Sequence, residues 1–269
     1  RMASANKKAM NIAVTGDITK DWNLARVFND SRDNTRWTAD LHAHASVQDG
    51  GAVLLSNLID QVAREVTSGK NYHLCTPTIP GILDSLDSSS HHSYAIWSLY
   101  KDGASEAWRL SEFLGISNKS DDADTKDCGF SIMDEPEQLD LLVIDDAALG
   151  FRNDPQVWPT SIKDSSNHPW ILLKMSKPLC QGRLWEELLE KHSEHLIILT
   201  TVSDLRATEV QISKGLSWER TAQDLYWELI HNPQINDFSR CASVVVSFGA
   251  AGAIVFSQMP PRPGSEPSS

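Results

Sequence analysis

The sequence predicts an α/β protein with a mainly parallel sheet and helices on both faces. Short apolar runs recur along the chain, and helical patterns separate several of them, which is typical of parallel strand-helix-strand units. The clearest unit has buried-type strands at 169–175 and 195–201 on either side of an amphipathic helix over 182–191. A connection of this kind makes the two strands parallel.

Other segments extend this pattern along the chain. Compact apolar runs predict strands at 11–15, 72–76, 95–100 and 139–145. Apolar residues at helical spacing predict helices over 52–66 and 104–114, and a third helix that follows an N-cap at Ser217 and ends before Pro233. In the first helix the apolar stripe consists of Leu55, Leu58, Ile59, Val62 and Val66, and in the second Trp108 and Leu114 are expected to face inward.

Composition and charge narrow the class of protein. The 269 residues are 41% hydrophobic and 22% charged, as in a globular protein with a sizeable core. A net charge of -12 argues against general affinity for nucleic acid or an anionic membrane, so an anionic ligand needs a local positive site. We expect one domain over 1–256 and a disordered Pro/Ser-rich tail over 257–269.

Cysteine use and targeting signals indicate the compartment. The four cysteines, at positions 75, 128, 180 and 241, form no CxxC pair, which fits a reducing environment better than a disulfide framework. The sequence has no apolar run of about 18 residues and no signal-peptide pattern. We therefore expect a cytoplasmic protein.

The stretch 242–256, ASVVVSFGAAGAIVF, is a candidate ligand-binding turn. An apolar run leads into Ser247, a small-residue loop holds Gly249 and Gly252, and a second apolar run follows. The carboxyl ends of strands are where open α/β sheets bind ligands, and glycine lets the backbone approach a phosphate or a base. A plain glycine hairpin between two strands explains the same pattern without a ligand.

Carboxylates and paired glycines mark other strand and helix ends. Asp17 ends the first strand, with Asp21 close behind it, and Asp145 and Asp146 end the strand at 139–145. A pair of carboxylates at a strand end can ligate magnesium, position a nucleophile or cap the next turn. Gly50 and Gly51 precede a helix, whose unpaired N-H groups can hold a hydroxyl or an anion. An ordinary Gly-Gly turn is the alternative.

The run Asp40 to His44, DLHAH, offers a different chemistry. Alternation along a strand would put His42 and His44 on one face, as in many metal-dependent hydrolases. The preceding TRWTA, however, lacks the apolar strand with which such a protein would begin. A metal-dependent hydrolase is kept as an alternative function.

The order of these segments resembles that of the ribokinase-like (PfkB-type) carbohydrate and nucleoside kinases. The matching residues are NIAVTGDITKD, DGGAVLLSNLIDQVA, LDLLVIDD, the pair WILLKM and LIILTT, and VVVSFGAAGAIVF. The segment SDLRATEVQISKGLSWERTAQDL also resembles one in bacterial proteins that join such a module to a ryanodine-receptor-type (RyR) repeat domain. The resemblance implies a three-layer ribokinase-like sandwich, with ATP and magnesium as cofactors.

The resemblance also implies roles for particular residues. Asp21 would contact a sugar hydroxyl, with Asp17, Gly50 and Gly51 at the same substrate site. The adenine nucleotide would lie at Thr201, Ser247, Gly249 and Gly252, and the magnesium at Asp145 and Asp146. The partners expected are thus a small sugar or nucleoside and a nucleotide, with no nucleic acid and no membrane, and the oligomeric state, including a homodimer, stays open.

Two departures from the family pattern limit the expected activity. The asparagine that helps the family grip its sugar falls at Leu55, and the Gly-Ala-Gly-Asp motif that supplies the catalytic base is not found in these 269 residues. Because phosphoryl transfer relies on a base and an anion hole, we expect either a truncated kinase-like domain or a non-catalytic nucleotide- or sugar-sensing module.

Overall fold

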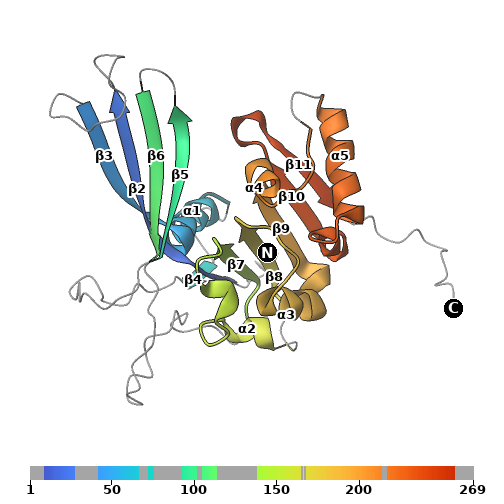
Figure 1. Cartoon of the computed structure of the whole chain (residues 1–269). Coiled ribbons are helices and arrows are strands. Elements are labelled where there is room, and N and C mark those ends of the chain that lie inside the picture. The colour runs from blue at the N-terminus through green and yellow to red at the C-terminus, as the bar shows by residue number, and fades with distance from the viewer. Residues whose placement is uncertain are drawn as a thin grey trace, which may run out of the picture.

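The computed structural model describes residues 9–27, 42–66, 72–75, 93–101, 105–113, 138–164, 166, 168–213 and 217–257. Within these residues the chain forms a seven-stranded sheet, in the order β11-β10-β9-β8-β7-β1-β4, and a four-stranded sheet beside it (Figure 1). The strands of the larger sheet are β1 (Met10–Gly16), β4 (Tyr72–Cys75), β7 (Leu141–Asp146), β8 (Trp170–Met175), β9 (Leu196–Thr201), β10 (Ser243–Ser247) and β11 (Ala253–Ser257).

The larger sheet is parallel from β4 through β10, and only β11 runs antiparallel to its neighbour. This confirms the predicted α/β class and the mainly parallel sheet. The strands expected near 11–15, 72–76, 139–145, 169–175 and 195–201 all form at those places. The stretch 242–256 forms β10, a short turn and β11, so the hairpin interpretation is confirmed.

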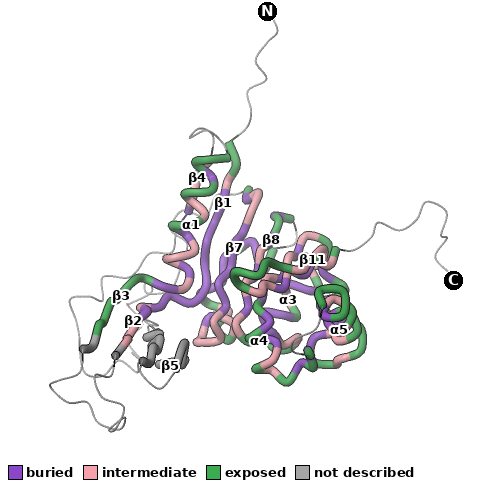
Figure 2. Tube along the Cα trace, turned by 90° about the horizontal axis from the view of Figure 1, so that it is seen from above, coloured by how far each residue is buried: buried purple, intermediate pink, exposed green. Residues whose placement is uncertain are grey.

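The centre of the larger sheet is covered on both faces. Ala13 and Val14 of β1 and Leu142, Val143 and Ile144 of β7 are completely buried, although neighbouring residues point to opposite faces (Figure 2). In β8, β9 and β10 burial alternates instead. One face of these three strands is therefore well covered and the other only partly.

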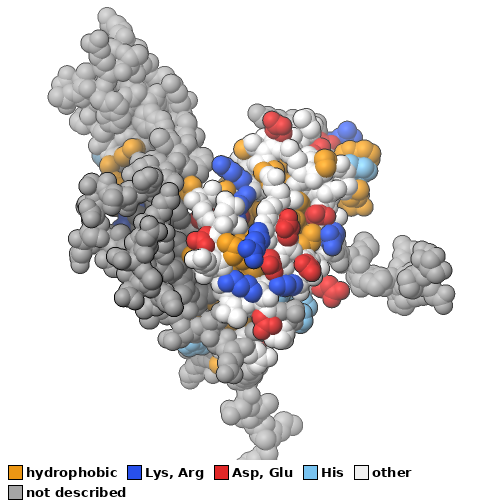
Figure 3. Space-filling view, turned by 60° about the horizontal axis from the view of Figure 1, so that its bottom comes forward, with side chains coloured by type: hydrophobic (Ala, Val, Ile, Leu, Met, Phe, Trp, Pro, Cys, Tyr) orange, Lys and Arg blue, Asp and Glu red, His pale blue; other side chains and the backbone are white. Residues whose placement is uncertain are grey.

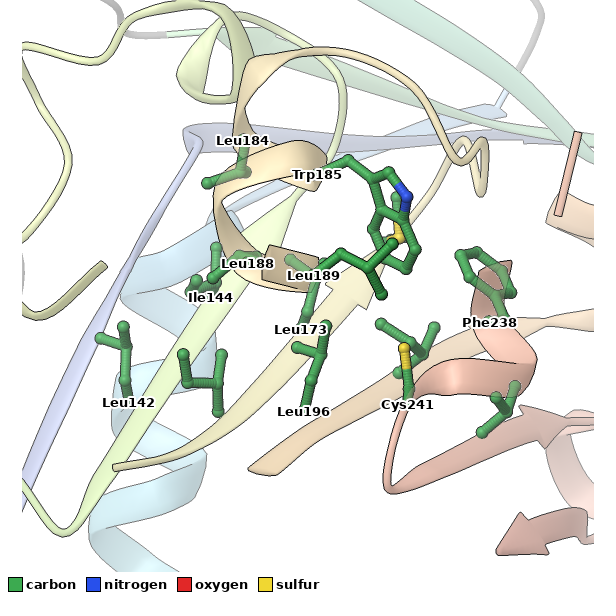
Figure 4. Close-up of a cluster of buried hydrophobic side chains, with 14 of the residues drawn as sticks. Leu142, Ile144, Leu173, Leu184, Trp185, Leu188, Leu189, Leu196, Phe238 and Cys241 are labelled. Atoms are coloured by element: carbon green, nitrogen blue, oxygen red, sulfur yellow. The ribbon is translucent and has the colours of Figure 1, made fainter. Parts of the chain in front are cut away.

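The well-covered face packs against α3 (Arg183–His192) and the helical segment η4 (Asn236–Arg240). Figure 4 shows Leu188 and Leu189 of α3 lying next to Ile144 and Leu173 of the sheet. The ring of Trp185 meets Phe238 edge to face, with centroids 5.1 Å apart. The remaining helical segments of this half are η2 (Phe151–Asn153), α2 (Thr160–Lys163), η3 (Ser193–His195), α4 (Val202–Ala207), α5 (Trp218–His231) and η5 (Gly249–Ala251).

The predicted caps and ends of two helices are also found. The α3 segment matches the helix expected over 182–191. Ser217 caps α5, its hydroxyl accepting the amide N-H of Arg220, and α5 ends at His231, before Pro233. Of the apolar residues at helical spacing in α5, Leu225 and Leu229 are buried, whereas Trp218 is 48% exposed.

Helix α1 (Gly51–Val66) lies behind the sheet in the view of Figure 4, against β1 and β7. Its place was predicted correctly, but its orientation differs from the expected one. The residues buried against the sheet are the small Ala52, Ser56 and Ala63, while Val62 and Val66 are 55% and 79% exposed. Small side chains let the helix lie close to β1 and to the corner between β1 and β2.

The four-stranded antiparallel sheet has the order β3-β2-β6-β5. Its strands are β2 (Ile18–Val27), β3 (His42–Gly50), β5 (Ser93–Lys101) and β6 (Ser105–Phe113). Only Asp17 separates β1 from β2, and β3 runs directly into α1, so this sheet is attached at one corner of the larger one (Figure 1). The strand expected at 95–100 is confirmed as β5.

The helix predicted over 104–114 is wrong, because this segment forms β6. It pairs along its length with β2 on one side and with β5 on the other. Backbone hydrogen bonds from two partner strands outweigh the weak local preference for a helix. Leu114, expected to face inward, lies outside the described residues.

Several further features bear on the other expectations. Cys75, Cys180 and Cys241 are free thiols, and burial raises the pKa of Cys241 to about 12.

In the described part of the chain no helix has the length and apolar character needed to cross a membrane. Acidic and basic side chains are interspersed on the face seen in Figure 3. Cys128 and the tail beyond Ser257 lie outside the described residues.

The orientation of α1 can be tested with two neighbouring residues. Val62→Ala should change the free energy of unfolding by no more than about 0.5 kcal/mol, because the side chain is largely exposed. Ala63→Leu should destabilise the protein by about 1 to 3 kcal/mol, because the larger side chain has to enter a packed contact. Urea unfolding of both variants checks this, and the reverse order of effects would show that the apolar stripe faces the sheet.

Candidate functional site

The candidate site lies along the carboxyl edge of the larger sheet. Strands β1, β7, β8, β9 and β10 run parallel, so their carboxyl ends meet at one edge. Asp17, one of the predicted substrate residues, follows β1, and the predicted nucleotide residues lie at the ends of β9 and β10 and in the turn after β10. Four strand spacings of about 4.8 Å separate β1 from β10, or about 19 Å in all.

Asp17 occupies the corner where the two sheets join. Its carboxylate accepts the backbone N-H groups of Ala147 at 2.8 Å, Leu149 at 3.1 Å and Phe151 at 2.9 Å, and its side chain has no exposed surface. Its own backbone N-H donates to the carbonyl of Asp145, and its carbonyl accepts the N-H of Ala52. Asp17 therefore holds the loop after β7 and the start of α1 in place.

Burial also changes the acidity of this carboxyl. Desolvation raises the pKa of Asp17 from 3.8 to about 6, against the opposing effect of the three amide hydrogen bonds, and the nearby charge of Asp146 raises it further. A group this buried and this fully hydrogen-bonded shapes the site and does not offer a free oxygen to a ligand.

Asp21 and the paired glycines form the first end of the site. Thr19 and Asp21 lie on β2, opposite Gly50 and Gln48 of β3, and the hydroxyl of Thr19 donates to Asp21 Oδ1 at 3.2 Å. A Cβ on Gly50 would lie 2.3 Å from Thr19 Oγ1 and 2.6 Å from Asp21 Oδ2. The glycine is thus required for the close approach of β3 to this carboxylate.

Gly51 is required for a different reason. Its φ of +57° is a left-handed conformation, and a Cβ would lie 2.1 Å from the carbonyl oxygen of Asp17. This conformation turns the chain from β3 into α1 at the point where the Ala52 N-H meets Asp17. The structure thus brings Asp17, Asp21, Gly50 and Gly51 together, a grouping that the sequence indicated only through the family resemblance.

Asp145 and Asp146, at the end of β7, are both held by basic side chains. Lys174 Nζ lies 2.8 Å from each oxygen of Asp145, and Arg152 Nε lies 3.0 and 2.9 Å from the oxygens of Asp146. Burial raises the pKa of Asp145, whereas Lys174 lowers it. Asp146 Oδ1 also accepts the N-H of Ala148, so it caps the turn after β7.

These pairings bear on the magnesium implied by the resemblance. Both carboxylates are nearly inaccessible, and basic groups already occupy their oxygens. Among the described residues, no cluster of three or more His, Cys, Asp or Glu side chains could hold a metal ion. The arrangement as found does not fit a magnesium ion, and no chemical step is derived through one.

The second end of the site is the turn after β10. Thr201 and Ser247 are register partners at the ends of β9 and β10. Thr201 Oγ1 donates to Asp204 Oδ2 at 2.6 Å and accepts the Asp204 N-H, and Ser247 Oγ accepts the N-H of Gly249. Gly249 and Gly252 have φ of +64° and +112°, and no heavy atom lies within 4 Å of a Cβ built on either.

The two ends of the site differ in the space around their glycines. At Gly50 the backbone is pressed against polar side chains, whereas at Gly249 and Gly252 the surface is open. The open turn rests on Phe248, whose ring packs edge to face against Trp218 with centroids 4.9 Å apart. It therefore offers an anchored backbone with room for a ligand above it.

Sequence reasoning missed the two basic residues of the edge. Lys174 is the only charged residue in the apolar strand WILLKM, and a charge at the end of such a strand was the available signal. Arg152 follows no pattern that separates it from an ordinary loop arginine. Of the histidine pair, His44 is exposed on β3, and the His42 side chain lies outside the described residues.

Two surface hollows lie elsewhere, beside α5. One of about 460 Å³ is lined by polar residues that include Gln211, Arg220 and Asp224, and one of about 300 Å³ lies between α5 and β11. Neither is lined by a residue that the resemblance assigned to the substrate, nucleotide or metal site.

Comparisons with known proteins add no family to this description. No protein-family model matches the chain, and a search of curated proteins finds no match either.

The pKa of Asp17 predicts a pH dependence of stability. Because the folded-state pKa is raised above the unfolded one, the group favours folding below pH 3.8, and this contribution is lost as the pH rises through 6. The difference in unfolding free energy between wild type and Asp17→Asn should therefore change by about 2 kcal/mol between about pH 4.5 and about pH 7, to the disadvantage of wild type at the higher pH. Urea unfolding of both proteins at each pH checks this, and a pH-independent difference would contradict the raised pKa.

Proposed function

We propose that the protein is a ribokinase-like binding domain that holds a carbohydrate or nucleoside and an adenine nucleotide along the carboxyl edge of its larger sheet. The hydroxyl-bearing molecule would lie at Asp21, Gly50 and Gly51. The nucleotide would lie at Thr201, Ser247 and the turn from Gly249 to Gly252.

One observation carries this proposal. Segments from the first and last parts of the chain, singled out by the sequence, lie at the carboxyl edge of one sheet, where β1 leads into the Asp21 corner and β10 leads into the glycine turn. In open α/β sheets this edge is where ligands bind. A simple hairpin explains the turn after β10, but it does not explain why the same edge carries the tightly packed Asp21 and Gly50 cluster.

The chemistry of the first end suits a hydroxylated molecule. A carboxylate accepts hydrogen bonds from hydroxyl groups, and Asp21 is already oriented by Thr19. Because Gly50 and Gly51 have no side chains, Thr19, Asp21 and the Asp17 carbonyl pack against their backbone, which holds the Asp21 carboxylate in a fixed position.

Binding without turnover is favoured over phosphoryl transfer by the state of the buried carboxylates. A catalytic base must accept a proton from the substrate hydroxyl. Asp17 is held by three amides, Asp145 by Lys174 and Asp146 by Arg152. Phosphoryl transfer from ATP to a hydroxyl is the second candidate, favoured by the shared edge that would bring the two ligands together.

Thermal unfolding with a ligand panel tests the proposal. ATP, and at least one member of a panel of pentoses, hexoses and nucleosides, should each raise the Tm by several degrees, since a ligand at 100 times its Kd adds about 2.7 kcal/mol of stability. Measurement of ADP formation with both ligands present distinguishes binding from turnover.

Two glycine variants make this test specific to the site. Gly50→Ala should lose the shift caused by the sugar or nucleoside and keep that caused by ATP, because the added methyl group displaces Asp21 and Thr19. Gly249→Ala should show the opposite pattern, because it strains the turn at a φ of +64°. No shift with any ligand, or equal losses in both variants, would refute the assignment of the two ends.

A further inference from the structure

Lys174 stands in the middle of the candidate site. In the strand order β10-β9-β8-β7-β1 it lies on β8, two strands from either end of the site. Its register partners are Asp145 on β7 and Leu199 on β9, so it shares a sheet face with both. Two strand spacings place the residue about 10 Å from each end.

The accessibility of Lys174 differs from that of its partner. The lysine side chain is 40% exposed, whereas Asp145 is 3% exposed. An ammonium group has three N-H donors, and Asp145 provides acceptors for two of them at 2.8 Å. Among the described contacts, one donor is left for a ligand approaching from solvent.

The negative charges around this edge make the accessible ammonium group of Lys174 important for binding an anion. Five carboxylates lie at this edge, in a chain whose net charge is -12: Asp145 and Asp146 end β7, Asp17 and Asp21 come soon after β1, and Asp204 comes soon after β9. Arg152 is only 14% exposed and is committed to Asp146 and to the carbonyl of Lys177. A phosphate group would be repelled along most of this edge, except where a basic group is accessible.

We propose that Lys174 binds the phosphates of the nucleotide, between the adenine-binding turn and the hydroxyl-binding end. This inference rests on the proposed function and makes it narrower, because the ligand of the nucleotide end must then carry phosphate groups that reach Lys174. A ligand reaching from Ser247 toward Asp21 has to pass over β8, and its phosphates would then be next to the Lys174 ammonium group. The hydrogen bond to phosphate is charge-assisted, the stronger class of such bonds.

The lysine is also held ready for this role. Asp145 holds the ammonium group of Lys174 through both of its carboxylate oxygens. Burial raises the pKa of Asp204, and the charge of Lys174 acts in the opposite direction and lowers it. Because Asp145 is buried, only the lysine of this ion pair is accessible to solvent. A ligand anion can bind without the rearrangement of a flexible surface lysine.

Isothermal titration with ATP and with adenosine tests this inference. In wild type ATP should bind at least about tenfold more tightly than adenosine, in line with one charge-assisted hydrogen bond. In Lys174→Met the ratio should fall to about one while adenosine affinity is unchanged, and Lys174→Arg should keep most of the preference. Lys177→Met, which removes an exposed lysine nearby, serves as the matched control and should leave the ratio as in wild type.

The design allows for the effect of the substitution on folding. Lys174→Met leaves Asp145 buried without its partner, which can destabilise the chain. The single variant Asp145→Asn is therefore compared with the double variant that also carries Lys174→Met, so that the two proteins differ only at residue 174. The affinity ratio does not depend on the folded fraction. An unchanged preference for ATP when the lysine is absent overturns the role of Lys174 alone, whereas failure of wild type to bind either ligand overturns the proposed function with it.

Discussion

The structure depends on one buried carboxylate. Asp17 accepts three backbone N-H groups from the loop after β7, and its backbone carbonyl accepts the N-H of Ala52 in the first turn of α1. A single residue thus joins the corner between the two sheets, the helix start and the loop that carries Arg152. The interaction has a cost, because desolvation raises the pKa of this carboxyl to about 6. Near neutral pH the folded protein therefore contains a buried negative charge, and the same carboxylate fixes the arrangement of the corner between the two sheets.

The two ends of the edge are built in opposite ways. At the corner, Gly50 and Gly51 are packed against Thr19, Asp21 and the Asp17 carbonyl, so the shape there is tightly determined. At the other end, Gly249 and Gly252 leave open space above an aromatic support. A rigid end suits selection among small molecules, and an open end suits a larger ligand held by its backbone contacts. The ion pairs of β7 lie between them and keep the intervening carboxylates neutralised.

Much of the larger sheet could be predicted from the sequence, because buried parallel strands are nearly all apolar and are bounded by turn residues. The strand β6 could not, since its identity depends on pairing with β2, far away in the chain. Periodicity showed which residues of α1 share a face but not which face turns to the sheet. The grouping of Asp21 with Gly50 was predicted only through the family resemblance. The amide cradle of Asp17 was beyond prediction, because it depends on the loop path through Ala148, whose φ is +60°.

The central claim, that Asp17 organises this corner, is tested most directly by amide hydrogen exchange in wild type and Asp17→Asn near neutral pH. The account predicts that the amides of Ala147, Leu149 and Phe151 exchange faster in the variant, at least one of them by about tenfold or more. Amides in β8 and β9 serve as the reference for global opening. Unchanged exchange across 147–151 relative to that reference would contradict the claim.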